Sequence, residues 1–119
     1  TVVWQAVNVE HACHYCVPAH TGIAKSMKVR DDLIEELRND ETLSDSKLNT
    51  LKETVLALTR GRGNVDNAQL DAFYSAGYKH QQLLEIILIL AQKVMSNYTN
   101  HLADTPVDEP FKKFDWSPK

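Results

Sequence analysis

Both cysteines of the chain lie in one short segment, EHACHYCVPAH, at residues 10–20. Cys13 and Cys16 are three positions apart, and at the start of a helix this spacing brings their Cα atoms to about 5–6 Å, within reach of a disulfide. A helix N-terminus favours negative charge, so we expect the Cys16 thiol to be partly ionised near neutral pH. A thiolate attacks peroxides and disulfides. The segment therefore predicts a redox-active cysteine pair.

Two titratable side chains flank the cysteines at helical spacings. His20 follows Cys16 by four residues, which places it one turn along on the same helix face, where it can exchange a proton with the thiol. Glu10 precedes Cys13 by three residues, and a carboxylate there can accept the thiol proton directly or through a water. We therefore expect Glu10 and His20 to move protons for the cysteines.

A zinc site is the main alternative use of these residues. Its ligands would be Cys13, Cys16 and His20, joined by Glu10, His11 or His14. Structural zinc sites usually take two ligand pairs from separate parts of a chain, and this chain has no second CxxC and no HxxxH. A buried inert cysteine pair is also disfavoured, because a carboxylate and a histidine accompany the thiols. We therefore favour redox chemistry without a bound metal or other cofactor.

The apolar periodicity predicts helices along most of the chain. We expect them near residues 2–10, 14–27, 33–37, 45–60, 66–77 and 79–102. Ser44 or Asp45 can cap the fourth helix and Asp66 the fifth, and Gly77 can end the fifth in a left-handed conformation. The β-branched residues of the first segment would also suit a strand. The predicted fold class is all-α, a compact bundle of about six helices in one domain over residues 1–119, with CxxC at a helix N-terminus.

The last residues of the chain differ from the rest. Residues 103–119 contain three prolines and no apolar period, so we expect an extended tail that lies on the surface through Phe111, Phe114 and Trp116. At the other end the apolar pattern is already established at Val2, without an initiator Met, so further residues could precede Thr1.

Composition restricts the partners and the location. The chain has 119 residues, 43% of them hydrophobic and 24% charged, which is typical of a globular domain. A net charge of −3 offers no attraction to nucleic acid or to an anionic membrane. No signal peptide is visible, and the apolar run Ile86–Ala91 is far shorter than the ~20 residues of a membrane span. We expect a cytoplasmic protein that binds neither nucleic acid nor membrane.

The last helix predicts self-association. From Leu83 to Leu90 it is apolar on nearly every side, and a few short helices of one small chain cannot cover it completely. A homo-oligomer with closed symmetry is the expected way to bury the remainder.

The segment Glu10–His20, read as ExxCxxCxxxH and followed by a small residue and an Ile-Ala pair, resembles the active-site motif of the alkylhydroperoxidase D and carboxymuconolactone decarboxylase family. Residues 77–111 are also similar to this family, with Gly-Tyr, a long apolar helix, an Asn near its end and a closing Pro-x-Asp-Glu-x-Phe. The two segments lie far apart, so that from Glu10 to Phe111 they span nearly all of the chain. The resemblance implies an all-α fold and assembly as trimers or hexamers.

The resemblance also implies a function in antioxidant defence. Cys16 matches the family's peroxide-reducing cysteine, Cys13 its disulfide partner, and Glu10 and His20 the proton relay. The substrate would be a hydroperoxide, and the reductant a dithiol protein that is thioredoxin-like or lipoylated. A thiol-disulfide oxidoreductase, a decarboxylase-type enzyme and a non-catalytic zinc module remain as alternatives, although decarboxylase members of the family generally lack the cysteine pair.

The chain departs from the family pattern beside the second cysteine. In the namesake enzyme the acid lies further upstream and a histidine precedes this cysteine, whereas here Tyr15 holds that position and His14 is the nearest substitute. Asn97 and His101 lie one turn apart on the last helix and could line a pocket, but we interpret them as a surface pair at a helix end.

Overall fold

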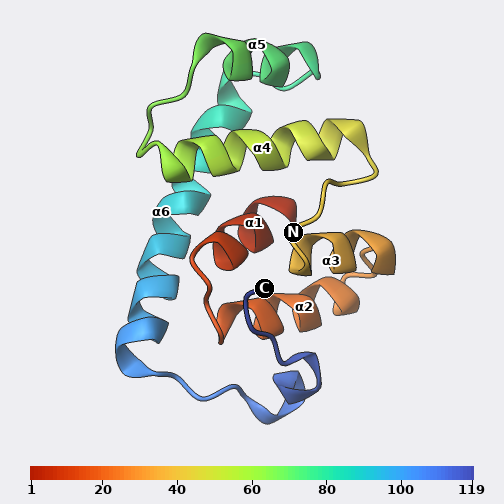
Figure 1. Ribbon diagram of the computed structural model, residues 1–119, viewed down its shortest axis with the longest axis vertical. Coiled ribbons are helices and arrows are strands. Elements are labelled where there is room, and N and C mark those ends of the chain that lie inside the picture. The colour runs from red at the N-terminus through yellow and green to blue at the C-terminus, as the bar shows by residue number, and fades with distance from the viewer.

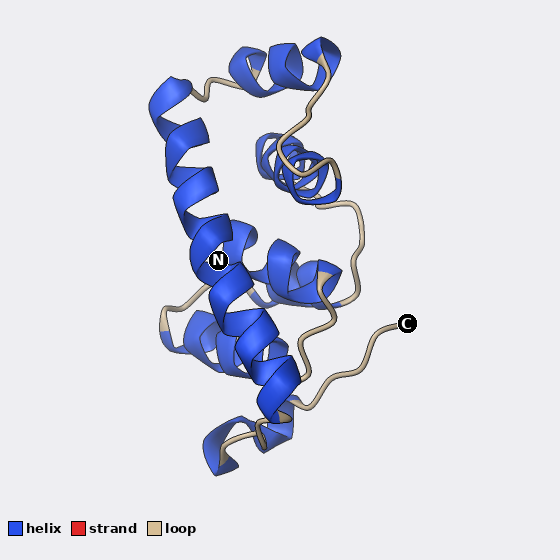
Figure 2. Cartoon of the chain, turned by 90° about the vertical axis from the view of Figure 1, so that its left-hand side faces the viewer, coloured by secondary structure: helices blue, strands red, loops and turns tan.

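The computed structural model describes residues 1–119 and contains helices but no strands (Figures 1 and 2). The α-helices are α1 (Val2–Glu10), α2 (Cys16–Ser26), α3 (Asp31–Arg38), α4 (Ser46–Arg60), α5 (Asn67–Ser75) and α6 (His80–Ala103), and a 3-10 helix, η1 (Glu109–Phe114), follows them. The predicted all-α fold is therefore confirmed, and each of the six expected helices is present.

Helix α1 lies in the middle of the molecule, where it packs against α2, α3, α4 and α6 (Figure 1). Its apolar side chains enter two cores, Ala6 and Val7 in one and Val2 in the other. Valine costs little in a helix compared with the free energy gained by burying its side chain. Burial therefore decides in favour of a helix, although the β-branched residues of α1 would also suit a strand.

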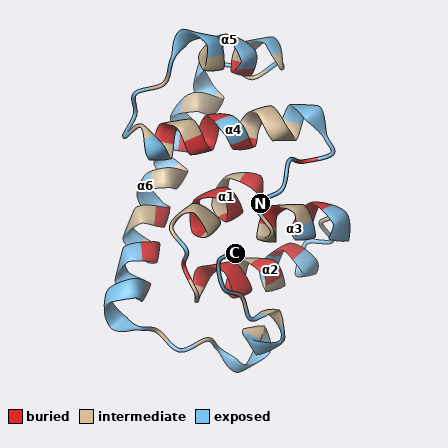
Figure 3. Cartoon of the chain, in the orientation of Figure 1, coloured by how far each residue is buried: buried red, intermediate tan, exposed pale blue.

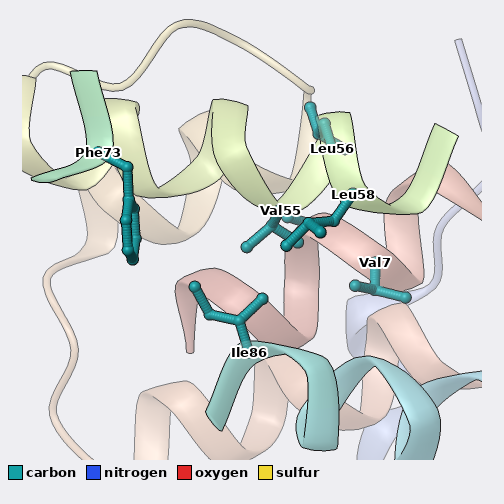
Figure 4. Close-up of a cluster of buried hydrophobic side chains, with 7 residues drawn as sticks. Val7, Val55, Leu56, Leu58, Phe73 and Ile86 are labelled. Carbon is teal, nitrogen blue, oxygen red and sulfur yellow. The ribbon is translucent and has the colours of Figure 1, made fainter. Parts of the chain in front are cut away.

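The larger core joins α1, α4, α5 and α6 (Figure 4). It consists of Ala6, Val7, Val55, Leu56, Leu58, Phe73 and Ile86. The smaller core lies beside α3 and contains Val2, Leu33, Leu37 and Leu43. Figure 3 shows the buried residues gathered on α1 and on the sides of α2, α3 and α4 that face it. Helix α1 is thus the element that connects the two cores.

The helix ends agree with the predicted caps. Of the two candidates before α4, Asp45 is the cap, since its side chain accepts a hydrogen bond from the Leu48 amide. Asp66 caps α5 in the same way through the Gln69 amide. Gly77 follows α5 with a φ of 104°, a left-handed conformation that glycine adopts without steric cost.

The tail lies on the surface as expected, but the expectation that it is extended throughout is wrong. Residues Glu109–Phe114 form η1, which begins with Pro110 in its first turn and packs against α2. Gly22 makes this close approach feasible, because a Cβ at that position would lie only 2.6 Å from Phe111. Beyond η1, the Trp116 indole donates to the Arg38 carbonyl at 2.8 Å. Packing on α2 therefore gives the tail a structure that its own sequence does not show.

Helix α6 runs along one side of the molecule and is mostly exposed (Figures 1 and 3). Its large apolar side chains Leu84, Leu88, Met95 and Leu102 are 67%, 72%, 73% and 90% exposed. The helix therefore covers the other elements with one face and leaves a long apolar face without a partner in this chain. No helix of the protein combines the length and the apolar character that crossing a membrane requires.

Candidate redox site

A tight turn between α1 and α2 places the two cysteines. After Glu10 the Ala12 amide donates to the Val9 carbonyl and the Cys13 amide to the Asn8 carbonyl, each at 3.0 Å. These two bonds form a Schellman motif, and Ala12 takes the left-handed conformation at its centre with a φ of 51°. The chain reverses there, so that Cys13 lies in the turn and Cys16 begins α2.

Cys13 and Cys16 are joined in a disulfide with their Cα atoms 5.2 Å apart. The predicted distance between the cysteines and the predicted position of Cys16 at a helix start are therefore both confirmed. Both residues are buried, with exposed fractions of 0% and 2%. A reaction partner can reach the sulfurs only past the side chains that cover them.

The two sulfurs have different surroundings. The Cys13 Sγ accepts the backbone N–H of Cys16 at 3.1 Å. The Cys16 Sγ faces α6, where it accepts N–H groups of Asn97 at 3.1 Å and Asn100 at 3.5 Å, with the Ser96 hydroxyl 3.9 Å away. Donors aimed at a sulfur favour its ionised form. In the reduced protein the side chains of α6 are therefore placed to stabilise a thiolate on Cys16.

Asn97 is the centre of a buried network. Its Nδ2 also donates to the Asn8 Oδ1 at 2.9 Å, and its Oδ1 lies 3.0 Å from the His11 Nδ1, which must then be the donor. Asn97 is 0% exposed, so our interpretation of Asn97 and His101 as a surface pair is wrong for Asn97. His101 is exposed, with its Nε2 3.3 Å from the Ala12 carbonyl oxygen.

Most of the α6 side of this site was not expected from the sequence. Lys93, Ser96, Asn97 and Asn100 follow one another at i, i+3, i+4 and i+7, which is the spacing of a single helix face. The shared face was the available signal, although this half of α6 also carries polar residues elsewhere, such as Gln92 and Thr99. It indicates a buried polar contact, but it does not say which other segment the face meets.

His20 reaches the cysteines through α6. Its Nε2 lies 3.0 Å from the Lys93 Nζ, and Lys93 donates to the Ser96 hydroxyl at 3.1 Å. No hydrogen bond joins His20 to Cys16 directly. Burial and the Lys93 charge, together with a smaller contribution from the α-amino group, lower the pKa of His20 to about 4, so its imidazole is neutral at pH 7. His20 therefore accepts a hydrogen bond here rather than supplying a positive charge.

Glu10 forms an ion pair at the C-terminal end of α1, directly before the CxxC turn. The Arg60 guanidinium holds its carboxylate with two hydrogen bonds, 2.8 Å from Nε and 2.9 Å from Nη2. The bond from Nη2 makes the contact bidentate, and it ties the end of α1 to the end of α4. Glu10 makes no hydrogen bond with either sulfur. Its part in proton transfer stays a prediction, and it requires the carboxylate to leave Arg60.

His14 and Tyr15, which stand between the cysteines, bind the segment after α6. The His14 Nε2 lies 2.9 Å from the Thr105 carbonyl oxygen, and the Tyr15 hydroxyl donates to Asp108 at 2.6 Å. The hydrogen bond to Asp108 raises the pKa of Tyr15. Neither side chain makes a hydrogen bond with a sulfur. They therefore fasten the connection between α6 and η1 over the CxxC turn.

A surface hollow of about 430 Å³ lies on α6 beside the disulfide. Its lining residues are Gln92, Met95, Ser96, Thr99 and Asn100. Ser96 and Asn100 also contact the Cys16 Sγ. Cys16 itself does not line the hollow; Ser96 and Asn100 separate its sulfur from it.

The zinc alternative does not gain support from the geometry. The cysteines are bonded to each other, and His20 is turned towards Lys93. No three His, Cys, Asp or Glu side chains are grouped in a way that could hold a metal ion.

The fold and the disulfide together define an all-helical protein with a CxxC pair at a helix start, in agreement with the expected alkylhydroperoxidase D-like bundle. In sequence, no protein-family model and no curated protein matches the chain. In structure, it is similar to an uncharacterized peroxidase-related protein from Silicibacter sp. TM1040, with a TM-score of 0.79 and 17% identity. The match covers 92% of this chain but only 59% of that protein. At this identity the similarity shows a shared fold.

Proposed function

We propose that this protein is a thiol-dependent peroxidase that reduces hydroperoxides through Cys13 and Cys16. The observation that carries the proposal is the position of the Cys16 Sγ, which accepts N–H groups from Asn97 and Asn100. Donors of this kind stabilise a thiolate, and a thiolate is the form that attacks a small electrophile. The resemblance of residues 10–20 to the alkylhydroperoxidase D motif and the fold shared with a peroxidase-related protein support the same function.

The reaction starts from the reduced protein. The Cys16 thiolate attacks the terminal oxygen of the hydroperoxide, the O–O bond breaks, and the alkoxide leaves and takes up a proton to become an alcohol. Cys16 is then a sulfenic acid, which the Cys13 thiol attacks to form the disulfide and release water. A dithiol protein, thioredoxin-like or lipoylated, reduces the disulfide and is itself oxidised to a disulfide. In this proposal Glu10 and His20 assist the proton transfers.

A count of free thiols tests the cycle. One equivalent of hydroperoxide should remove both thiols of the reduced wild-type protein, because one disulfide forms for each peroxide consumed. Cys13→Ser should stop at a sulfenic acid on Cys16. Thiols that persist in the wild-type protein, or a loss that continues in Cys16→Ser, would contradict the proposal.

A thiol-disulfide oxidoreductase is a second candidate, and one observation favours it. The Cys16 amide at the start of α2 donates to the Cys13 Sγ, so the first cysteine of the motif is also stabilised as a thiolate. Such a thiolate would attack a substrate disulfide. The two candidates differ in rate: a peroxidase should react faster with a hydroperoxide than with a small disulfide, and an oxidoreductase should show the opposite order.

The proposal includes assembly as a trimer or a hexamer in the cytoplasm. The exposed apolar residues of α6 support self-association, since leaving each of them in water forgoes about 1.5–3 kcal/mol. A reducing cytoplasm would keep the pair available as thiols rather than as a permanent disulfide. Light scattering should show a homo-oligomer, and Leu88→Glu on the exposed face of α6 should dissociate it. A wild-type protein that stays monomeric at micromolar concentration would refute the assembly.

A further inference from the structure

The protein contains two buried lysines with different partners. Lys52 is 6% exposed, and its Nζ pairs with the Asp40 carboxylate at 2.9 Å and with the Glu41 carbonyl at 2.7 Å. Lys93 is 4% exposed and forms no ion pair; it contacts only neutral groups, the His20 Nε2 and the Ser96 hydroxyl. Burial of an ammonium without an anion is costly. The position of Lys93 therefore requires an explanation that the position of Lys52 does not.

In the reduced protein, the Cys16 sulfur can supply the anion that Lys93 lacks. The Ser96 hydroxyl that accepts from Lys93 lies 3.9 Å from the Cys16 Sγ, so it can donate its own proton to that sulfur. Lysine, serine and sulfur then form one chain of hydrogen bonds in a single direction. In the disulfide the sulfur carries no charge, whereas in the reduced protein it can be a thiolate.

We propose that Lys93 is the counter-ion of the Cys16 thiolate, acting through Ser96, so that the charge pair exists only when the disulfide is reduced. The inference rests on the proposed function in one respect, namely that the Cys13–Cys16 disulfide opens during the working cycle. Lys93 is a positioning residue, because one hydroxyl separates it from the reacting sulfur.

The proton count of this arrangement balances. When a dithiol opens the disulfide, it supplies the two hydrogens of the two new thiols; the Cys16 thiol then releases its proton to solvent, which leaves a thiolate joined through Ser96 to the Lys93 ammonium. Burial lowers the pKa of Lys93 to about 8 in the oxidised protein, so at neutral pH the side chain is still mainly an ammonium and can pair with the thiolate. The same burial strengthens the attraction between the two charges once both are present.

The other titratable groups around Lys93 do not take this role. His20 of α2 faces the same ammonium as a neutral acceptor, and the α-amino group of Thr1, at the start of α1, adds a second positive charge near His20. On α6 itself, the neighbours on the same face are the neutral Ser96, Asn97 and Asn100. No carboxylate forms an ion pair with Lys93, whereas Cys16, which can become an anion, is linked to it through Ser96.

A thiolate titration tests the inference without any peroxide. In Cys13→Ser protein Cys16 is the only thiol, and its ionisation can be followed by the ultraviolet absorbance of the thiolate as the pH changes. Adding Lys93→Met should raise the pKa of Cys16 by about one unit or more, because a nearby positive charge is lost. Lys93→Arg keeps the charge and should restore most of the difference. Lys52→Met removes the other buried lysine and should leave the pKa of Cys16 unchanged.

The reduction potential of the disulfide gives a second measurement. Loss of Lys93 destabilises the thiolate form, so the potential of Lys93→Met should become more negative, whereas that of Lys52→Met should not change. Ser96→Ala leaves Lys93 in place but removes the hydroxyl that links it to Cys16. It should shift the pKa of Cys16 and the reduction potential in the same directions as Lys93→Met, but by smaller amounts. This variant also serves if Lys93→Met fails to fold.

Two results would overturn the inference. The first is a folded Lys93→Met protein in which the pKa of Cys16 and the reduction potential are unaltered; if that variant does not fold, the same result for Ser96→Ala counts instead. The second is a Lys93→Arg protein in which both quantities shift as far as in Lys93→Met. Failure of the peroxidase proposal would give a different experimental result. In that case the wild-type thiols survive hydroperoxide while the pKa of Cys16 still responds to Lys93, and the counter-ion assignment stands.

Discussion

Around Phe73, helices α4 and α5 meet α1 and α6 through aliphatic and aromatic side chains (Figure 4). Around Cys16, by contrast, helices α1 and α2 meet α6 through amides, a hydroxyl and a lysine. Both regions are buried, and both use α1 and α6. The apolar region draws its stability from the area it removes from water. The polar region must match each donor with an acceptor, because an unmatched polar group inside a protein costs free energy.

Almost every buried donor and acceptor of the polar region has a hydrogen-bond partner. Asn97 uses both ends of its amide, and Gln5 donates to the Val17 carbonyl and to Thr21. The exceptions lie together at the redox site: the His20 Nδ1 is buried without a partner, and Lys93 is buried without an anion. A protein departs from good packing rules where function requires it. The polar region is therefore organised around Cys16, and five predictions test this.

The largest effect is expected in the apolar region. Phe73 is 0% exposed and stacks on Tyr78 with 4.8 Å between ring centroids. Phe73→Ala should lower the free energy of unfolding by about 3–5 kcal/mol, because it removes a large side chain and leaves a cavity. Denaturant unfolding measures the loss. The pKa of Cys16 in the folded variant should stay at its wild-type value, and a shift would show that the two regions are coupled.

Asn97→Ala should have a smaller effect on stability but a direct effect on Cys16. The truncation leaves the Asn8 Oδ1 and the His11 Nδ1 without a partner, which should cost about 1–3 kcal/mol. It also removes an N–H donor from the Cys16 Sγ and should therefore raise the pKa of the thiol. Asn67→Ala, at an exposed asparagine that begins α5, is the control for losing an asparagine. Equal thiol pKa values in the two variants would contradict the role assigned to Asn97.

The pH dependence of stability should show the titration of the two buried groups that lack a full set of partners, Lys93 and His20. Burial lowers the pKa of Lys93 from 10.5 to about 8, so between these values the unfolded chain binds a proton that the folded, oxidised protein has released. Stability of the oxidised protein should therefore rise with pH across this window, and Lys93→Met should flatten the rise. A thiolate partner would keep Lys93 protonated, so the rise should be weaker in the reduced protein.

His20 makes the corresponding prediction at low pH. Its pKa is lowered from 6.5 to about 4, so its contribution to stability is complete above pH 6.5 and is lost as the pH falls towards 4. His20→Gln should flatten this part of the profile. Denaturant midpoints measured across both windows test the two residues, and a variant that keeps the wild-type slope would show that another group titrates there.

The smallest effect on stability is expected at Glu10, where the two roles of one carboxylate can be separated. Glu10→Gln should cost only about 0.2–1 kcal/mol, since the ion pair with Arg60 is partly exposed. If Glu10 assists proton transfer, the same change should slow the reaction with hydroperoxide by about a hundredfold. Arg60→Gln removes the same ion pair but keeps the carboxylate, so it should retain the rate. Equal rates in Glu10→Gln and the wild type would remove Glu10 from the relay.

The sequence by itself determined the local structure of this protein. Six helices, the Asp45 and Asp66 caps, the left-handed Gly77 and the disulfide at the start of α2 all follow from the residues within one or two turns of each position. Helical spacing and capping are short-range effects, so a single sequence is sufficient to predict them. The Cα separation of 5.2 Å between the cysteines is likewise set by short-range geometry, since the two residues are three positions apart.

Only the tertiary structure decided which residues meet Cys16. Ser96, Asn97 and Asn100 lie 80 or more positions further along the chain, and they reach the sulfur because α6 is rotated and shifted to bring their face against α1 and α2. The same packing directs Glu10 to Arg60 and lays η1 on Gly22. A helical period states which residues share a face, but the element that this face meets depends on how all the helices bury their apolar surfaces together.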